Sequence, residues 1–471
     1  MYNSLNKYNM SNRKPNSKYQ EWVILYTIRY LFILIYWFVV RLIKNSKILF
    51  PLWLWVIIPE WAMKNHALVM AGSGSGKSEF LKCLIFSRVW RHQATCILDP
   101  HGDMAAQVAR WTEWAGRGRK RLVLIDPFLN PWHIPGFNPF NLKEPTERNI
   151  ELMTQALIRT FEGLLVNSFT ARMETMLRYV FPVLLRREGS TMKDLKRFME
   201  IWDFANNQDL LELGLNSPNP EHREYFSNDF LDVSVHSTKK WLRDRISSFL
   251  ASPIFTKIIT AERNTFDLEE LFNQDKCVIF NLSKWHLGAD ISQALWWIFV
   301  WYIQYLAHKR VDVPEKDRNN VYVFIDEFPN FTVKDPKVFE NMLSEVRKYG
   351  FSLVLANQYP KQIGEALKES IEENSQIWIR WYSQKDDELK LLKKWEFIVE
   401  IWWCEKEKIK VPTFLLKFKN SMAKWRWKRV KKYQLKTYYE NLYKWEKEEW
   451  NQMKDIKDVI KDELEQFIPK I

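Results

Sequence analysis

Cysteine and histidine are scarce in this sequence. Four cysteines (Cys83, Cys96, Cys277 and Cys404) and eight histidines occur among 471 residues, and the cysteines lie far apart without any CxxC pair. The histidines show no spacing that is typical of metal ligands. This pattern argues against a disulfide framework and against a structural zinc site, and it is typical of reduced thiols in a cytosolic body.

Glycine is also scarce, while tryptophan is abundant. The chain has 13 glycines and 24 tryptophans, so glycine makes up about 3% of the residues, against about 7% in average proteins. Several tryptophans stand beside predicted strands where turns favour glycine, among them Trp285, Trp395, Trp402 and Trp403. We hypothesise that many of the tryptophans are UGA codons that the source cell reads as glycine. The alternative is a genuine aromatic-rich surface for lipid or for a partner.

Acidic residues are fewer than basic ones. The chain carries 57 acidic and 70 basic residues, which give a formal net charge of +13. A basic surface suits nucleic acid or anionic lipid as a partner. Hydrophobic residues make up 46% of the chain and supply a sizeable core, and the length allows about three domain-sized units.

Long apolar runs are rare, and the one of membrane length lies near the N-terminus. Residues 1–20 are polar and contain four basic residues and no acidic one, which predicts a disordered basic tail. Trp22–Val40 is mostly apolar, and its 19 residues just suffice to span a bilayer. We therefore predict a membrane anchor at residues 21–45, with a buried core helix or a helix on the membrane surface as alternatives. A single span with a cytosolic body places the basic tail outside, against the positive-inside tendency.

A glycine-rich loop follows the short apolar run Ala67–Ala71, and a helix-compatible run, Glu79–Val89, comes after it. Strand, glycine loop, Lys-Ser and helix in this order are typical of a phosphate-binding loop. Its backbone N–H groups and the helix N-terminus favour an anion. The alternative is a glycine-rich turn that binds nothing, and Ala71 stands where the pattern usually has its first glycine. The candidate nucleotide-binding residues are Gly72, Ser73, Gly74, Ser75, Gly76, Lys77, Ser78 and Glu79.

A second candidate segment ends in two acidic residues. The apolar run Val321–Ile325 leads directly into Asp326 and Glu327. In enzymes with a phosphate-binding loop, the first acid holds Mg²⁺, and the second can activate the attacking water. Alone, this run is equally typical of a strand followed by a capping acid. Together with Lys77 and Ser78, it predicts an ATP site with Mg²⁺ held by Ser78 and Asp326.

Strand-like and helix-like segments alternate from Ala67 onward. Most of the apolar runs end in or run into polar residues, which predicts an α/β fold with a mostly parallel sheet and a site at its carboxyl edge. Between 147 and 253 only helical patterns occur. We predict one domain formed by residues 46–145 and 256–415, an all-helical insertion at 146–255, and a charged tail at 416–471. The expected strands include Thr95–Asp99, Leu122–Asp126, Cys277–Leu282, Val321–Asp326 and Ser352–Ala356.

The order of the motifs carries a family resemblance. After the glycine loop, the chain contains the segments ILDPHGD (97–103), FNPFN (137–141), FNLS (280–283), IDEF (325–328), LSEVRKYG (343–350) and LANQ (355–358). The series covers about residues 65–415 and resembles the conjugative coupling ATPases of type IV secretion and their relatives, the HerA/FtsK-like DNA pumps. An N-terminal membrane segment and a helical insertion are similar to coupling proteins too. Asp99, His101 and Asp103 lie in one of these segments, where Pro-His-Gly-Asp predicts a turn rather than a metal site.

The resemblance implies a RecA-like fold, a homo-hexameric ring and ATP-driven movement of single- or double-stranded DNA. It also implies an inner-membrane location with the motor in the cytoplasm, and relaxase or secretion-channel proteins as partners. Gln358 matches the family's glutamine that senses the γ-phosphate. Arg347 matches the arginine that such rings insert into the neighbouring subunit's site. Without the resemblance, Arg347 is equally well a solvated helix residue near Glu345.

Two other functions fit the same sequence. One is a secretion ATPase that powers protein export or pilus assembly without threading DNA. The other is a membrane scaffold that binds nucleotide without hydrolysing it. A scaffold would not need the full set of catalytic residues that the sequence contains, namely Lys77, Asp326, Glu327 and Gln358. Stimulation of ATP hydrolysis by DNA distinguishes a DNA-moving ATPase from a secretion ATPase that does not thread DNA.

Overall fold

The computed structural model describes residues 58–442, apart from 59, 73, 166–167, 201–203, 330–335, 359–362, 364, 382–388, 390–391, 403, 405 and 412–420. The predicted basic tail (1–20), the predicted membrane anchor (21–45) and the end of the charged tail (443–471) lie outside the described residues. Within the described ranges, no helix is both long enough and apolar enough to cross a bilayer.

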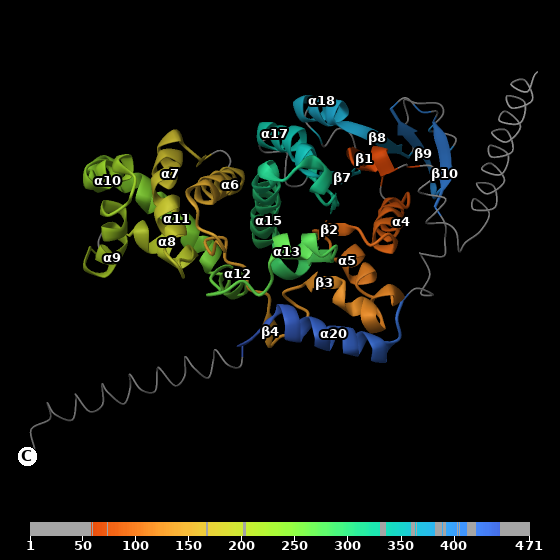
Figure 1. Cartoon of the computed structure of the whole chain (residues 1–471), viewed down its shortest axis with the longest axis horizontal. Helices are drawn as coiled ribbons and strands as arrows, with labels where there is room; N and C mark the ends of the chain where they lie inside the picture. Colours follow the sequence, from red (N-terminus) through yellow and green to blue (C-terminus); the bar gives the residue numbers. More distant parts are fainter. Residues whose placement is uncertain are drawn as a thin grey trace, which may run out of the picture. The chain divides into compact units, whose positions relative to one another are not determined.

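A large sheet forms the centre of the described chain (Figure 1). Its strand order is β10-β9-β8-β1-β7-β6-β2-β5-β3. All neighbours from β8 to β3 are parallel, and β9 and β10 are added antiparallel at one end. This confirms the predicted α/β fold with a mostly parallel sheet. The strands are β1 (His66–Met70), β2 (Ala94–Asp99), β3 (Leu122–Ile125), β5 (Cys277–Asn281), β6 (Val321–Ile325), β7 (Phe351–Asn357), β8 (Ser375–Arg380), β9 (Glu396–Ile401) and β10 (Glu407–Lys410).

The central strands consist of nearly continuous apolar residues because both of their faces are covered. Every residue of β2, β3, β6 and β7 is buried, which is the burial expected of parallel strands between two layers of helices. Strand β8 instead alternates buried and half-buried residues, and β10 buries only Ile409. These two strands near the edge have weaker apolar signals, and the sequence did not predict them.

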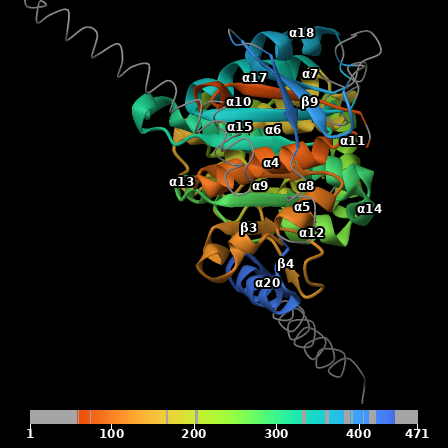
Figure 2. The ribbon, with the colours of Figure 1, turned by 90° about the vertical axis from the view of Figure 1, so that its right-hand side faces the viewer.

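Helices lie on both sides of the sheet (Figures 1 and 2). Helices α4 and α5 lie on one side, and α13, α15 and α17 lie on the other. Such crossover helices are the usual connection between parallel strands. The helices around the sheet are α3 (Glu60–Met63), α4 (Lys77–Trp90), α5 (Asp103–Val108), α13 (Leu268–Asn273), α14 (Lys284–Leu287), α15 (Ala289–Lys309), α17 (Pro336–Val346) and α18 (Glu365–Asn374).

The elements between the short strand β4 (His133–Ile134) and β5 are all helical in the described residues. Its first helix packs lengthwise against α15, which joins the helical segment to the sheet (Figure 1). Local caps set the helix starts: Thr170 accepts a hydrogen bond from the Met173 N–H, and Thr191 with Asp194 forms a reciprocal capping box. The helices are α6 (Glu147–Leu165), α7 (Ala171–Arg186), α8 (Met192–Phe198), α9 (Phe204–Leu215), α10 (Pro220–Ser227), α11 (His236–Leu250) and α12 (Pro253–Ile259).

The contact between α6 and α15 contains fully buried tryptophans. A Cβ atom on Gly163 of α6 would approach the Trp297 ring to 2.6 Å, so the two helices meet at a position that admits only glycine. The indole N–H groups of Trp297 and Trp301 are buried and have no hydrogen-bond partner within the described part of the chain. Buried indoles usually find a partner. These positions are thus among those where the hypothesis of recoded glycine is most relevant.

The C-terminal helix α20 (Lys424–Tyr438) packs along β3, the last strand of the sheet. The buried Gln434 accepts a hydrogen bond from the Leu124 N–H at 2.9 Å and donates to the Leu122 carbonyl at 2.8 Å. Strand β11 (Glu440–Asn441) then pairs with β4. A side-chain amide therefore satisfies two backbone groups on the free edge of β3, as an additional strand would otherwise do. No local sequence pattern predicts this packing.

Candidate nucleotide site

Four candidate segments meet at one edge of the sheet because they follow neighbouring strands. The glycine loop follows β1, Gln358 follows β7, Asp326 and Glu327 follow β6, and Asp99 ends β2. These strands are adjacent in the order β1-β7-β6-β2 and are parallel, so their carboxyl ends lie side by side. This is the edge at which α/β sheets bind ligands.

The glycine loop has the backbone conformation that only glycine adopts readily. Gly74 and Gly76 have φ angles of 77° and 102°, in the left-handed region. The loop closes on itself through a hydrogen bond from the Ser75 N–H to the Gly72 carbonyl, and the Lys77 N–H donates to the Ser75 hydroxyl. Helix α4 then begins at Lys77, so its first unpaired N–H groups border the loop. Ser73 lies outside the described residues.

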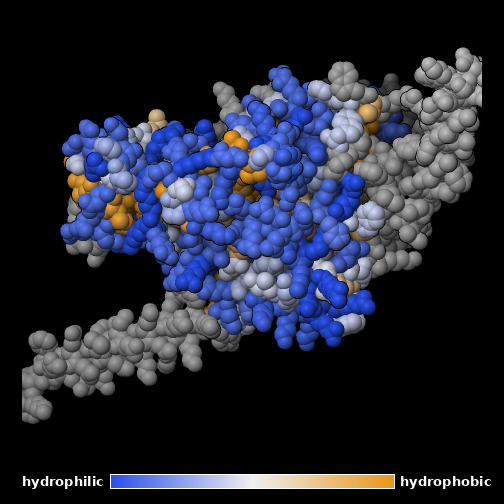
Figure 3. All heavy atoms as spheres, in the orientation of Figure 1, coloured by the Kyte–Doolittle hydropathy of each residue, from blue (hydrophilic) through white to orange (hydrophobic). Residues whose placement is uncertain are grey.

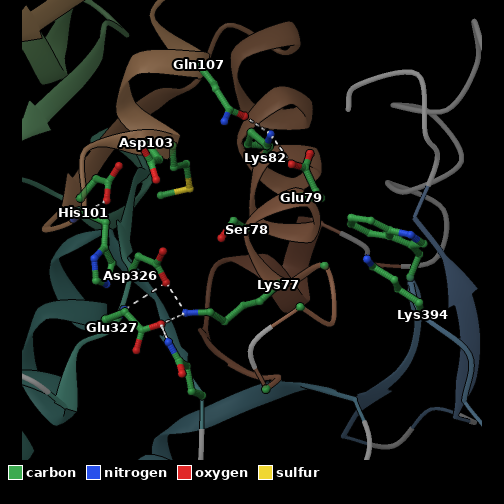
Figure 4. A pocket seen from close by; sticks show the side chains of 17 residues that line it. Lys77, Ser78, Glu79, Lys82, His101, Asp103, Gln107, Asp326, Glu327 and Lys394 are labelled. Carbon is green, nitrogen blue, oxygen red and sulfur yellow. Dashed lines mark hydrogen bonds and ion pairs between the residues drawn. The ribbon is translucent and has the colours of Figure 1, made fainter. Parts of the chain in front are cut away.

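Lys77 joins the loop to the acidic strand end (Figure 4). Its ammonium nitrogen lies 2.5 Å from a carboxylate oxygen of Asp326 and 2.5 Å from one of Glu327. The side chains are almost fully buried, at 7% exposure for the lysine and 6% for each carboxylate. Gln358 donates a hydrogen bond of 2.7 Å to the same Glu327 oxygen. The structure thus brings together Lys77, Asp326, Glu327 and Gln358.

The backbone at Glu327 is strained. Its φ angle is 52°, in a region that non-glycine residues rarely adopt. The flanking residues hold it there, because the Asp326 N–H donates to the Leu98 carbonyl and the Phe328 N–H donates to the Ala356 carbonyl. Such strained residues concentrate at functional sites, where the surrounding structure fixes them.

Asp99 organises the turn after β2. Its carboxylate accepts hydrogen bonds from the backbone N–H groups of His101 (2.9 Å) and Ala105 (2.8 Å), and Gly102 has a φ angle of 86°. Burial raises the pKa of Asp99, against the lowering effect of these hydrogen bonds, and the nearby Asp326 raises it further. The 99–103 segment is therefore a turn that borders the site. Within the described ranges, no group of three or more His, Cys, Asp or Glu side chains is arranged to hold a metal on its own.

A cavity of about 390 Å³ lies between the loop and the acidic strand end. Helix α4 contributes Lys82, which is buried and whose ammonium contacts Glu79 at 2.6 Å and also the side-chain oxygen of Gln107. Four of the lining residues have no local sequence signal, because only the tertiary fold brings α5 and the turn before β9 to the loop: Lys82, Gln107, Lys394 and Trp395. The lining residues are Gly72, Gly74, Gly76, Lys77, Ser78, Glu79, Lys82, Asp99, His101, Asp103, Met104, Gln107, Asp326, Glu327, Gln358, Lys394 and Trp395.

Trp395 occupies an unusual position beside the loop. Its φ angle is 73°, a conformation that is an outlier for a bulky residue. Its N–H donates to the Ser75 carbonyl at 3.1 Å, and its ring lies so close to Gly76 that a Cβ atom there would overlap it. A glycine at 395 would adopt this backbone without strain and would leave the loop more open. This observation supports the recoding hypothesis at position 395.

Arg347 lies apart from this cavity. It begins the 3₁₀ turn η8 (Arg347–Tyr349) just before β7, and its side chain is exposed. The seven residues of β7 separate this turn from Gln358, a distance of about 20 Å along an extended strand. Arg347 therefore cannot reach the Lys77 site of its own chain.

The residues at the cavity fit a nucleoside triphosphate with a divalent cation. The open glycine loop and the start of α4 offer N–H groups to phosphate oxygens. The hydroxyl of Ser78 and the carboxylate of Asp326 are hard oxygen ligands of the kind that Mg²⁺ prefers. Adding a side chain at Gly74 would meet no atom within 4 Å, so space remains above the loop.

Comparison with known proteins agrees with this geometry. Residues 57–294, just over half of the chain, match the family described as the central domain of helicase HerA. No protein of curated function matches the chain by sequence.

Solved structures share the fold. The unbound bacterial conjugative coupling protein TrwBdeltaN70 superposes with a TM-score of 0.53 at 15% identity, covering 78% of this chain and 88% of its own. The plasmid coupling protein TrwB in complex with ADP and Mg²⁺ gives a TM-score of 0.52 at 15% identity, covering 77% and 89%. TrwB in complex with a non-hydrolysable ATP analogue gives 0.50 at 15% identity, covering 78% and 89%. The family match confirms the resemblance that the motif series predicted, and the chain belongs to the family defined by the central domain of helicase HerA.

Proposed function

We propose that this protein is an ATP-driven motor that moves DNA in conjugation or type IV secretion. The observation that carries the proposal is the buried cluster of Lys77, Asp326, Glu327 and Gln358 beside an open glycine loop. TrwB, which has the same fold, is described as a conjugative coupling protein and has been solved with ADP and Mg²⁺ and with a non-hydrolysable ATP analogue. ATP and Mg²⁺ are accordingly the proposed cofactors.

Each residue of the cluster has a proposed role that follows from its chemistry. The loop Gly72–Gly76 and the N-terminus of α4 bind phosphate oxygens through backbone N–H groups. Lys77 neutralises phosphate charge, and the oxygens of Ser78 and Asp326 hold Mg²⁺. Glu327 orients the attacking water and accepts its proton. Gln358 directly follows β7 and already donates to the Glu327 carboxylate. A movement of the end of β7 would therefore change the position of the catalytic acid.

Assembly into a homo-hexamer completes the proposed site. Arg347 is exposed and lies at the far end of β7 from its own cavity. An arginine supplied by the neighbouring subunit would stabilise charge in the transition state, with an effect of about 10³–10⁵ in related phosphoryl-transfer enzymes. Exposure and distance are the properties that such a residue requires.

The proposed location in the cell is based on the domain bounds expected from the sequence. Residues 21–45 anchor the chain in the cytoplasmic membrane, and the motor, formed by 46–145 and 256–415, works in the cytoplasm with the helical insertion 146–255. Secretion-channel or relaxase proteins are the expected partners. The net charge of +13 supports an anionic substrate such as DNA.

Hydrolysis of ATP by the purified full-length chain, with and without DNA, tests the proposal. We expect Mg²⁺-dependent hydrolysis that rises severalfold when duplex or single-stranded DNA is added. Because DNA phosphates release counterions on binding, the stimulation should weaken steeply with salt. Hydrolysis that DNA does not change would instead favour protein export or pilus assembly, and no nucleotide binding at all would refute the nucleotide site.

A further inference from the structure

A cluster of unpaired basic side chains lies at the β3 end of the sheet, where α20 runs (Figure 1). Seven of its members are on α20 and three are on the 3₁₀ segment η2 (Gly116–Lys120), and neither element contains an acidic residue. Most of these cations are exposed, and the surface over α20 is mostly hydrophilic (Figure 3). We call this cluster the α20 face: Arg117, Arg119, Lys120, Lys424, Arg426, Lys428, Arg429, Lys431, Lys432 and Lys436.

The charge on the α20 face is not neutralised by the protein itself. No member of the face forms an ion pair with an acidic side chain within the described part of the chain. The helical insertion differs, because several of its basic residues pair with nearby acids, as in Arg159–Glu162, Arg178–Glu174 and Arg186–Glu147. An ordinary solvated helix shows such mixed charge. Unrelieved positive charge on a packed helix is instead the electrostatic footprint of an anionic partner.

The face is held in a fixed position by buried groups. Val430, Gln434 and Tyr438 are the buried residues of α20, and the Gln434 amide is bonded to the β3 backbone on both of its polar atoms. The Arg119 guanidinium lies over the Tyr433 ring, 5.6 Å from its centroid, which joins η2 to α20. The cations are therefore presented as one surface, with less loss of conformational freedom on binding than a mobile tail would suffer.

A hollow of about 360 Å³ opens between η2 and α20. Arg119, Arg426 and Arg429 line it together with Gly116 and Trp425. The Arg119 Nε atom is buried without a hydrogen-bond partner in the described residues, so this guanidinium retains unused donor capacity. Guanidinium groups bind phosphate through two parallel N–H donors, which suits a phosphate group that enters such a hollow.

The arrangement favours a nucleic-acid backbone over a membrane surface. A helix that lies on a membrane inserts a continuous exposed apolar face into the lipid. On α20 the apolar Val430 and Tyr438 are buried against the body, and Trp425, at 55% exposure, stands among the cations. The cations from Lys424 to Lys436 extend over about 18 Å, at 1.5 Å per residue. A DNA duplex presents about ten phosphate charges over that length.

We propose that the α20 face is a second DNA-binding surface, which holds the phosphate backbone of the substrate beside the motor. It is separate from the nucleotide cavity, because the two hollows share no lining residue and β3 lies two strand spacings, or about 10 Å, beyond β2, the nearest strand that ends at the cavity. The inference rests on the proposed function in taking DNA as the substrate. It adds a binding site outside the cavity and outside the motifs that carry the family resemblance, and it depends on the charges and not on the indoles of Trp425 and Trp427.

A charge-neutralising variant of the full chain tests this proposal. In the variant, Arg119→Gln, Arg426→Gln and Arg429→Gln are combined. The matched control combines Lys193→Gln, Lys240→Gln and Lys257→Gln, which removes two exposed cations from the helical insertion and one from α12. Binding of a labelled 30-base-pair duplex is measured by fluorescence anisotropy at several salt concentrations, and ATP hydrolysis without DNA and thermal melting are measured alongside.

We expect the affinity of the α20 variant for the duplex to fall at least tenfold. The slope of log affinity against log salt concentration should also become shallower, by the equivalent of up to about three phosphate contacts. Basal hydrolysis should stay as in the wild type, melting reports any effect of losing the Arg119–Tyr433 contact, and the control should bind DNA normally. A second variant, Lys428→Gln with Lys432→Gln, should weaken binding partially even if the first fails to fold.

Equal DNA affinities for the variant and the control would overturn the proposal. Loss of binding to vesicles that contain anionic lipid, with DNA binding intact, would also overturn it and would assign the face to the membrane. Either result leaves DNA-stimulated hydrolysis by the wild type in place. Failure of the proposed function would instead appear as wild-type hydrolysis that DNA does not change.

Discussion

Replacing Lys77 by methionine should destabilise the nucleotide-free protein. The ammonium of Lys77 lies 2.5 Å from carboxylate oxygens of both Asp326 and Glu327, and all three side chains are nearly buried. Lys77→Met leaves two adjacent carboxylates without a counterion. Removing one partner of a buried ion pair costs about 3–5 kcal/mol. The loss of unfolding free energy caused by Lys77→Met should therefore be about 3–5 kcal/mol.

Denaturant unfolding followed by circular dichroism, in EDTA and without nucleotide, measures this loss. Lys64→Met, which changes an exposed lysine, serves as the control and should have little effect. The double variant Lys77→Met with Glu327→Gln should recover most of the stability, because a single carboxylate then remains. A loss no larger than that of the control, or no recovery in the double variant, would refute the view that Lys77 neutralises the two acids.

Three further predictions follow from named residues. Arg347→Ala and Lys77→Ala subunits should each be inactive alone, and mixing them should restore part of the ATP hydrolysis, because some interfaces then contain both groups; an Arg347→Ala protein that hydrolyses ATP normally would exclude the role in trans. Acid should destabilise the protein through His66, because burial lowers its pKa from 6.5 to about 4. As pH falls from about 6.5 to about 4, the unfolded chain binds a proton that the native imidazole does not, so the unfolding free energy should drop by about 3 kcal/mol, and the His66→Gln variant should lack this component in a pH series of unfolding curves. At Trp395, the gene should carry UGA and peptides from the native source should have the mass of glycine; a UGG codon or an indole mass there would end the recoding hypothesis for this position.

The central strands could be predicted from the sequence because buried parallel strands consist of continuous apolar residues. Strands β2, β5, β6 and β7 were expected within one or two residues of their observed bounds. The polar strand β10 lacks such a run, and so does β8, in which buried and half-buried residues alternate. The sequence of α20 is so highly charged that it predicts a tail rather than a packed helix. Its packing depends on Gln434, a residue whose contact with β3 has no local signal.

The candidate site was predictable where its residues directly follow strands. The positions of Lys77, Asp326 and Gln358 were expected from motif order, and the structure adds that one Glu327 oxygen contacts both Lys77 and Gln358. Lys82 and Gln107 could not be predicted, because an ordinary lysine on α4 and a glutamine on α5 meet only after both helices pack on one side of the sheet. The proposed role of Arg347 cannot be derived from the structure of a single chain, because it requires a neighbouring subunit.

The Glu327→Gln variant tests the central claim, that this cluster hydrolyses a nucleotide, most directly. Nucleotide binding by calorimetry and ATP hydrolysis are measured on the same preparation, with Glu224→Gln, which changes an exposed acid of the helical insertion, as the control. We predict that Glu327→Gln binds ATP as the wild type does and hydrolyses it about 10²–10⁴-fold more slowly, because the general base is lost. Hydrolysis by Glu327→Gln at the wild-type rate would contradict the account.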